Sequence, residues 1–101
     1  MKKTHRNSEK IIGIAWYRKE QWALLRQVSE EPDKFEDTHE EWLNNATAFK
    51  KKLEVEGIVV KEVDIDIEYI IKWCKERHIP INSNNIAEYV ASKLRALNKL
   101  N

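Results

Sequence analysis

Only four residues of this 101-residue chain can break a regular element easily, since it contains two glycines and two prolines. Globular proteins average about 7% glycine and about 5% proline, so this chain has few positions for tight turns. Charged residues make up 35% of the sequence, above the usual ~25%. Helices with charged outer faces suit this composition, whereas β-sandwiches, collagen-like repeats and disordered segments do not. The sequence therefore predicts a soluble, helix-rich protein.

The distribution of apolar residues predicts one domain behind a short polar leader. Hydrophobic residues make up 42% of the chain, and a chain of this size buries roughly 60–70% of its unfolded surface, which is enough for one core. Residues 1–10 are polar, and we expect a flexible leader there. Residues 11–101 contain no repeat, linker or low-complexity tract, so we expect them to form a single domain.

The same distribution excludes a membrane span and predicts a cytoplasmic protein. No apolar run approaches the ~20 residues that a bilayer crossing needs. The apolar stretch 11–16 follows several basic residues, but it is shorter than the ~7–15 residues of a signal-peptide core. Cys74 is the only cysteine, so an internal disulfide and a cysteine-based zinc cluster cannot form. A reducing cytoplasm is the expected location.

The chain begins with a predicted strand and a short helix. Residues 11–16 are mostly branched or aromatic and predict a strand, in which Gly13 allows another backbone to approach closely. Apolar residues then recur at helical spacing from 18 to 29, and Pro32 limits this helix.

A second, longer helix is predicted over 39–56. Thr38-x-x-Glu41 is a capping-box pattern at its start, and Gly57 supplies the residue that most readily closes a helix. Acidic residues lie near its start and lysines near its end, as the helix dipole favours. Its expected buried stripe consists of Trp42, Leu43, Ala46, Phe49 and Leu53.

The second half of the chain repeats the pattern of one strand and two helices. Residues 58–63 are largely β-branched and predict a strand, after which Asp64 or Asp66 can cap the third helix. That helix ends at Ile79-Pro80, and Asn82 or Ser83 caps the fourth. The expected buried stripes are Ile67, Ile70, Ile71, Cys74 and His78, and then Ile86, Tyr89, Val90, Leu94 and Leu97.

These elements predict an α+β fold of order β-α-α-β-α-α, with four helices packed on a small two-stranded sheet. Two strands alone make a weak sheet unless helices cover a face or another subunit extends it, so we expect the helices to pack on one side of this sheet. The sequence leaves parallel and antiparallel pairing open.

Two groups of residues raise the hypothesis of an enzyme. Asp64 and Asp66 follow a strand and could form the centre of a small metal-dependent hydrolase, although helix capping explains both without a metal. Cys74 and His78 lie four residues apart on one predicted helix and could, with His39, hold a metal or activate a thiolate. A core cysteine and a helix-terminal histidine explain the pair more simply. No glycine-rich phosphate loop, nucleophile elbow or HExxH motif is present, so we predict no enzyme, no metal and no cofactor.

The four tryptophans are the main argument for a binding protein. Trp22 and Trp42 fit the inner stripes of their predicted helices, whereas Trp73 aligns with Tyr69 and Arg77 at the edge of its stripe. Aromatic residues and arginine are the types that most often carry binding energy at interfaces. Tyr69, Trp73 and Arg77 are therefore the predicted interaction surface, for a protein partner or for a second copy of the chain.

A nucleic-acid-binding module is the alternative prediction. Residues 72–101 carry six basic side chains against two acidic ones, a local charge of 6 − 2 = +4, and the helix pair over 65–98 could form a helix-turn-helix. The candidate contacts would be Ser83, Asn84, Asn85, Lys93 and Arg95. The formal charge of the whole chain is only +1, which argues against nucleic acid as the partner.

Three segments of the chain resemble a group of small bacterial proteins catalogued as hypothetical. They are I-A-W-Y-R-K-E-Q-W at 14–22, E-D-T-H-E-E-W-L at 36–43 and V-D-I-D-I-E-Y-I-I-K-W-C at 63–74. The resemblance implies a freestanding cytoplasmic bacterial protein and carries no functional residues. The sequence thus predicts a non-enzymatic protein-interaction module.

Overall fold

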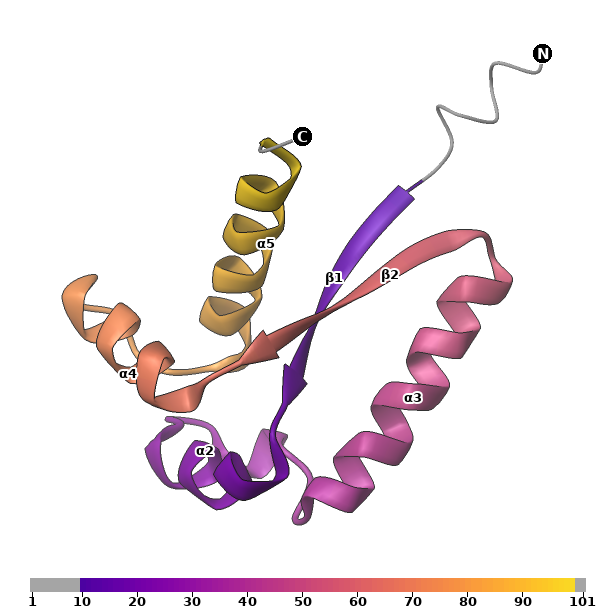
Figure 1. Ribbon diagram of the computed structural model, residues 1–101. Coiled ribbons are helices and arrows are strands. Elements are labelled where there is room, and N and C mark those ends of the chain that lie inside the picture. The colour runs from indigo at the N-terminus through magenta and orange to yellow at the C-terminus, as the bar shows by residue number, and fades with distance from the viewer. Residues whose placement is uncertain (1–9, 100–101) are drawn as a thin grey trace.

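The computed structural model describes residues 10–99 and has the predicted order of elements, β-α-α-β-α-α (Figure 1). Two short 3-10 helices, η1 and η2, flank the first α-helix. Residues 1–9 of the expected leader lie outside the described residues, and Lys10 belongs to the first strand, not to the leader. The elements are β1 (Lys10–Tyr17), η1 (Lys19–Gln21), α2 (Trp22–Val28), η2 (Pro32–Lys34), α3 (His39–Val55), β2 (Ile58–Ile65), α4 (Ile67–Glu76) and α5 (Ser83–Lys99).

The two strands pair in parallel, which resolves the question that the sequence left open. Their register runs from Lys10 opposite Ile58 to Tyr17 opposite Ile65, so every residue of each strand has a partner. Parallel neighbours need a long crossover because the chain must return to the starting end of the first strand. Here α2 and α3 form that crossover.

The two long helices flank the sheet on opposite sides, so the prediction that the helices cover one side was wrong (Figure 1). A Cβ atom at Gly13 would lie 2.9 Å from the Val90 side chain of α5, which places α5 on that face. Glu62, next to the register partner of Gly13, instead binds Lys50 of α3, with an Oε2–Nζ distance of 2.8 Å. Since neighbouring residues of a strand point to opposite faces, the sheet is the middle layer of three.

The helix ends follow the predicted start and stop signals. The Thr38 hydroxyl accepts a hydrogen bond from the Glu41 amide (3.1 Å) at the start of α3, and Gly57 has a positive φ of 87° just beyond its end. Asp66 caps α4 by accepting from the Glu68 amide (3.1 Å), and Asn82 caps α5 by accepting from the Asn85 amide (2.8 Å). None of the helices within residues 10–99 is long and apolar enough to cross a membrane.

The buried core draws on all the strands and α-helices. Tyr17, Trp22, Phe35 and Trp42 form a network of edge-to-face and tilted aromatic contacts where β1, α2 and α3 meet. The aliphatic part of the core joins β2 to the helices and comprises Leu25, Val63, Ile65, Ile67, Ile70, Cys74, Ile86 and Val90. The aromatic cluster thus holds the crossover, while the aliphatic cluster holds the C-terminal helices.

Three residues of the predicted stripes are exposed, so the prediction of burial was wrong for them. Phe49 and Leu97 are both half exposed. Phe49 lies about 100° around α3 from Lys50, which reaches Glu62 of the sheet, so Phe49 is off the side of the helix that meets the sheet. His78 is exposed because α4 ends at Glu76 and the chain turns away before the histidine.

Gly13 provides a direct test of how closely α5 packs on the sheet. We expect Gly13→Ala to lower the free energy of unfolding by about 1–3 kcal/mol, because the added methyl group would overlap Val90 Cγ1. Combining it with Val90→Ala should cost less than the sum of the two single changes, since the second change removes the overlap. Urea denaturation of all four proteins measures this coupling, and additive losses would contradict the close contact.

Candidate interaction surfaces

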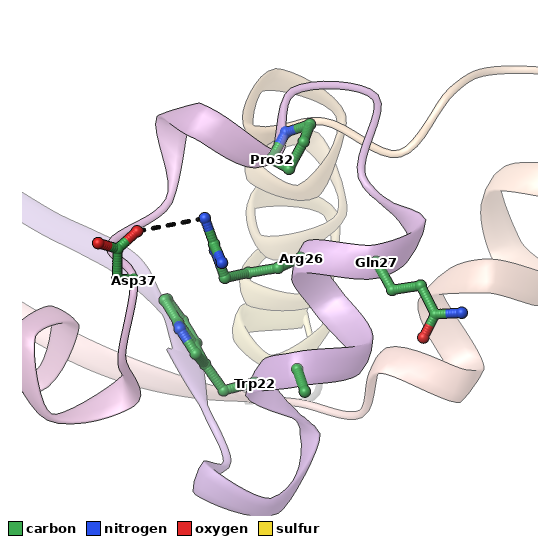
Figure 2. Close-up of a pocket in the computed structure, with 6 residues that line it drawn as sticks. Trp22, Arg26, Gln27, Pro32 and Asp37 are labelled. Carbon is green, nitrogen blue, oxygen red and sulfur yellow. Dashed lines mark hydrogen bonds and ion pairs between the residues drawn. The ribbon is translucent and has the colours of Figure 1, made fainter.

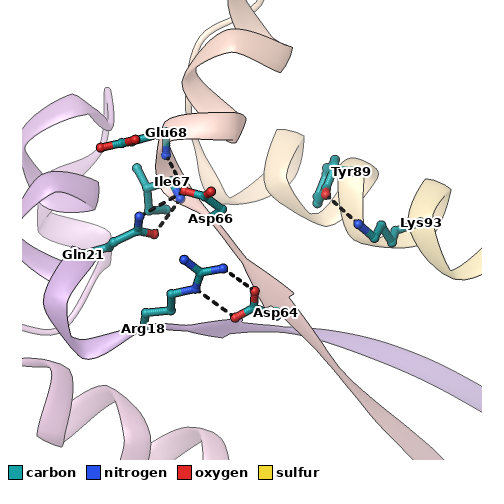
Figure 3. A network of polar contacts seen from close by, with 8 residues as sticks. All are labelled: Arg18, Gln21, Asp64, Asp66, Ile67, Glu68, Tyr89 and Lys93. Atoms are coloured by element: carbon teal, nitrogen blue, oxygen red, sulfur yellow. Dashed lines mark hydrogen bonds and ion pairs between the residues drawn. The ribbon is translucent and has the colours of Figure 1, made fainter.

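Asp64, near the end of β2, and Asp66, just after it, form a polar clamp between the ends of the two strands (Figure 3). Arg18, next to the end of β1, donates from Nε and Nη2 to the two carboxylate oxygens of Asp64, at 3.1 and 2.6 Å. Gln21 donates to Asp66 (3.0 Å) and accepts from the Ile67 amide (2.7 Å). Each acid is therefore bound by residues that follow β1, and the pair ties η1 to the start of α4.

This clamp accounts for the charge state of both acids. The hydrogen bond from Arg18 lowers the pKa of Asp64 below its usual value, although partial burial acts in the opposite direction. The hydrogen bond from Gln21 likewise lowers the pKa of Asp66, again against desolvation. Within residues 10–99 no three His, Cys, Asp or Glu side chains come together as ligands for a metal ion. Asp64 and Asp66 therefore have a structural role: they connect the residues after β1 to the end of β2 and the start of α4.

Cys74, His78 and His39 lie in three different environments. Cys74 is buried in the core, and this burial raises the pKa of its thiol, with partial opposition from nearby Arg77. His78 has a positive φ of 56° in the turn after α4, where its amide and that of Ile79 donate to the carbonyls of Lys75 and Cys74. His39 Nε2 lies 2.8 Å from the Tyr17 carbonyl oxygen. The three side chains do not form a common site.

Two of the three residues of the predicted interaction surface, Trp73 and Arg77, make contacts with other residues of the same chain. Arg77 places its guanidinium 4.1 Å from the centre of the Trp73 ring and donates to the Trp73 carbonyl oxygen (3.2 Å). Trp73 also packs edge-on against Tyr89 of α5, with ring centres 5.4 Å apart. Tyr69 contacts Tyr89 as well but remains 50% exposed. The stripe mainly joins α4 to α5, and it leaves Tyr69 as the accessible aromatic ring.

The candidate nucleic-acid contacts do not converge on one face. Lys93 and Arg95 are two residues apart in α5, which separates them by about 200° around the helix axis. Asn85 uses its side-chain amide to donate to the Pro80 carbonyl oxygen (2.8 Å), while Ser83 and Asn84 are exposed at the start of the helix. Lys93 Nζ lies 3.3 Å from the Tyr89 hydroxyl. A single strip of phosphates could not meet all five residues together.

A pocket of about 370 Å³ opens between α2 and η2 (Figure 2). Arg26 Nη2 lies 3.4 Å from Asp37 in this pocket, and its buried Nε has no partner among the described residues. The segment 30–41 carries seven acids and one lysine, so its field disfavours an anionic ligand at the arginine. The pocket therefore offers an isolated ion pair and no convergent set of polar groups. Its lining residues are Trp22, Ala23, Arg26, Gln27, Pro32 and Asp37.

Sequence reasoning missed an apolar surface at one end of the molecule. Ile11 and Val59 are register partners in the sheet, and both remain exposed, at 44% and 36%. Figure 1 shows the starts of both strands at the same end as the C-terminal ends of α3 and α5. Val55 of α3 and Leu97 of α5 add exposed apolar area to this end. The sequence signal for this apolar surface was the β-branched residues near the start of each strand, which are Ile11 and Ile12 in β1 and 58–60 in β2.

A further groove of about 350 Å³ runs along β2 beside α5. Its lining includes four successive residues of β2 and three residues from the last turns of α5. They are Lys61, Glu62, Val63 and Asp64, and Lys93, Leu94 and Leu97.

The clamp predicts how stability responds to acid. A carboxyl whose pKa is lowered by folding contributes stability above its unfolded pKa of about 4, and this contribution is lost as the pH falls through the lower folded pKa. We therefore expect the free energy of unfolding to fall below pH 4, and to fall less in Asp64→Asn, which has no carboxyl to protonate. Arg18→Gln should flatten the profile in the same way. Urea denaturation between pH 7 and about pH 2.5 measures this, and parallel profiles for all three proteins would contradict the assignment.

The turn at His78 predicts a stabilising substitution. A left-handed conformation costs a residue with a Cβ roughly 1–2 kcal/mol, whereas glycine adopts it freely but loses about 0.5–1 kcal/mol in chain entropy. We expect His78→Gly to raise the free energy of unfolding by up to ~1 kcal/mol, and His78→Ala to leave it lower than the glycine variant. Thermal and urea unfolding of the three proteins provide the comparison. A loss of stability in His78→Gly would indicate that the imidazole has a role in the fold.

Comparison of the chain with protein-family models, with curated proteins and with solved structures gave no match. The geometry of residues 10–99 therefore carries the functional argument.

Proposed function

We propose that this chain is a non-enzymatic protein-interaction module whose first partner is a second copy of itself. The observation that carries the proposal is the edge of β1. The sheet has two strands, so each strand has one hydrogen-bonded neighbour and one open edge within residues 10–99. A parallel sheet is normally covered on both faces and continued by further strands, and this sheet stops at two.

The two open edges differ in a way that favours β1 as the contact. Natural proteins protect exposed strand edges from other chains by placing charged residues on them. β2 carries Lys61, Glu62 and Asp64, whereas β1 has no charged residue after Lys10. The β1 edge therefore lacks the usual protection, as expected of an edge that another strand covers.

The exposed apolar side chains support the same surface. Ile11, Val59 and Leu97 lie on the face and end of the molecule where α5 leaves the sheet uncovered. Removing such side chains from water contributes about 25 cal/mol for each Å² buried. A second β1 strand approaching this edge would bury part of that surface and satisfy the outward backbone groups at the same time.

Two-fold symmetry makes this arrangement self-limiting. In a two-fold dimer each chain presents the same patch, so β1 would pair antiparallel with the β1 strand of the second copy. The result is a four-stranded sheet with β2 at both outer edges, where the charged residues are. Charged edges at both ends would oppose further growth of the sheet.

The state of the reactive groups supports a role without catalysis. Asp64 and Asp66 are bound by Arg18 and Gln21, and Cys74 is buried with a raised pKa. A buried thiol of this kind suits the reducing cytoplasm that we propose as the site of action.

Sedimentation equilibrium of Ile11→Lys tests the proposal. We expect the wild-type chain to sediment at twice the mass of one chain, and Ile11→Lys to raise the dimer dissociation constant at least about tenfold, or ~1.4 kcal/mol, because two lysines would meet at the interface. Tyr69→Lys is the matched control, since its side chain has a similar exposed fraction, 50% against 44%, but lies on α4. A wild-type chain that remains monomeric up to about 1 mM would exclude the proposal.

Hydrogen exchange provides a second measurement on the backbone itself. Amides of a strand with one neighbour point alternately inward and outward, so only every second amide of β1 would be protected in a monomer. A β1 contact between two copies should protect the intervening amides as well. Loss of this added protection in Ile11→Lys, with the circular dichroism spectrum unchanged, would separate loss of the interface from loss of the fold.

A further inference from the structure

The groove beside β2 includes the backbone edge of the strand. Side chains of neighbouring strand residues point to opposite faces, yet Lys61, Glu62, Val63 and Asp64 all line the same groove. Successive residues share one groove where it follows the open edge on which both faces meet. β2 has β1 as its one strand neighbour within residues 10–99, so its other edge borders this groove.

The opposite wall of the groove is apolar and comes from α5. Leu94 and Leu97 are three residues apart and therefore neighbours on one side of the helix. Leu97 is 51% exposed, whereas Leu94 is half-buried and Val63, at the base, is buried. An open strand edge facing an apolar helix wall is the geometry in which extended peptides add to a sheet.

The two acids and the two lysines that line the groove differ in whether they are paired. Its two acids are engaged elsewhere: Glu62 binds Lys50 at 2.8 Å, and Asp64 binds Arg18 at 2.6 Å. Its two lysines, Lys61 and Lys93, have no carboxylate of a described residue within 4.0 Å. Figure 3 shows Lys93 directed toward the Tyr89 hydroxyl, with its Nζ 3.3 Å from that oxygen.

We infer that this groove binds an extended segment of another protein, added as a strand beside β2, in which every second side chain faces α5 and these side chains are in turn acidic and apolar. The backbone of the segment would pair with the edge of β2, and its apolar side chains would lie against Leu94 and Leu97. Its carboxylates would meet Lys61 and Lys93. A second copy of the chain fits this edge poorly because it would bring its own Lys61 and Lys93 to it.

This contact is separate from self-association. Pairing of two copies through β1 leaves both β2 edges free, so a dimer would offer two such grooves. Failure of peptide binding would leave the mass measurement unaffected, and a monomeric chain would still bind the segment.

Titration of the isotope-labelled full chain with a short peptide tests the inference. The probe is an acetylated, amidated heptapeptide in which glutamate and valine take turns at every second position, with serine between them, so that both face α5; it spans about 20 Å when extended. We expect amide chemical shifts to change at 61–64 and 93–97, with binding that weakens as salt is added. The same peptide with lysine in place of glutamate should not bind.

Charge reversal at one wall provides the decisive variant. Lys93→Glu should weaken peptide binding about fivefold or more, while Lys51→Glu, an equal change of net charge on exposed α3, should leave it unchanged. Leu97→Ala should also weaken binding, and its exposure makes it safe for the fold. The absence of shifts up to about 1 mM peptide, shifts outside the groove, or equal affinity in Lys93→Glu would overturn the inference. So would preferential binding of a single-stranded oligonucleotide by the same residues.

Discussion

Parallel pairing of β1 with β2 is the constraint on which the rest of the structure depends. Between the two strands the chain must run back along the sheet, and α2 and α3 form this crossover connection. Parallel pairing also brings the C-terminal ends of both strands together. There Arg18 and Gln21, which follow β1, donate hydrogen bonds to Asp64 and Asp66 at the end of β2. The acids that look like a reactive centre in the sequence therefore hold the two halves of the chain together.

The hydrophobic core is covered at one end of the molecule, and apolar side chains are exposed at the other. At the C-terminal ends of the strands, the aromatic cluster and α4 close the core over Tyr17 and Ile65. At the starts of the strands, the helices end without a further layer, and Ile11 and Val59 remain accessible. Because natural sheets seldom leave such an edge bare, this contrast supports the proposed contacts with other chains better than any single residue type does.

Signals from neighbouring residues predict most of the secondary structure. The candidate interaction surfaces depend instead on contacts between segments that are far apart in the sequence. Thr38, Gly57 and Asp66 mark helix ends through short-range hydrogen bonds and backbone preference, so their roles could be predicted from neighbouring residues alone. The exposure of Phe49 depends on which side of α3 meets the sheet, and the coverage of Trp73 depends on its contact with Tyr89 of a different helix. Strand direction was beyond prediction for the same reason. No local pattern records which distant segment will lie alongside.

The separation in sequence between paired strand residues also affects how the chain folds during its synthesis. Lys10 pairs with Ile58, a separation of 58 − 10 = 48 residues, and synthesis proceeds at about 5–20 residues per second. The first strand thus leaves the ribosome with its uncharged edge bare for about 2–10 s before its neighbour exists. During that interval α3 can form by itself, whereas β1 can pair only with other polypeptides. Nascent chains on one messenger are the nearest source of a matching strand, so assembly of two copies could begin during translation.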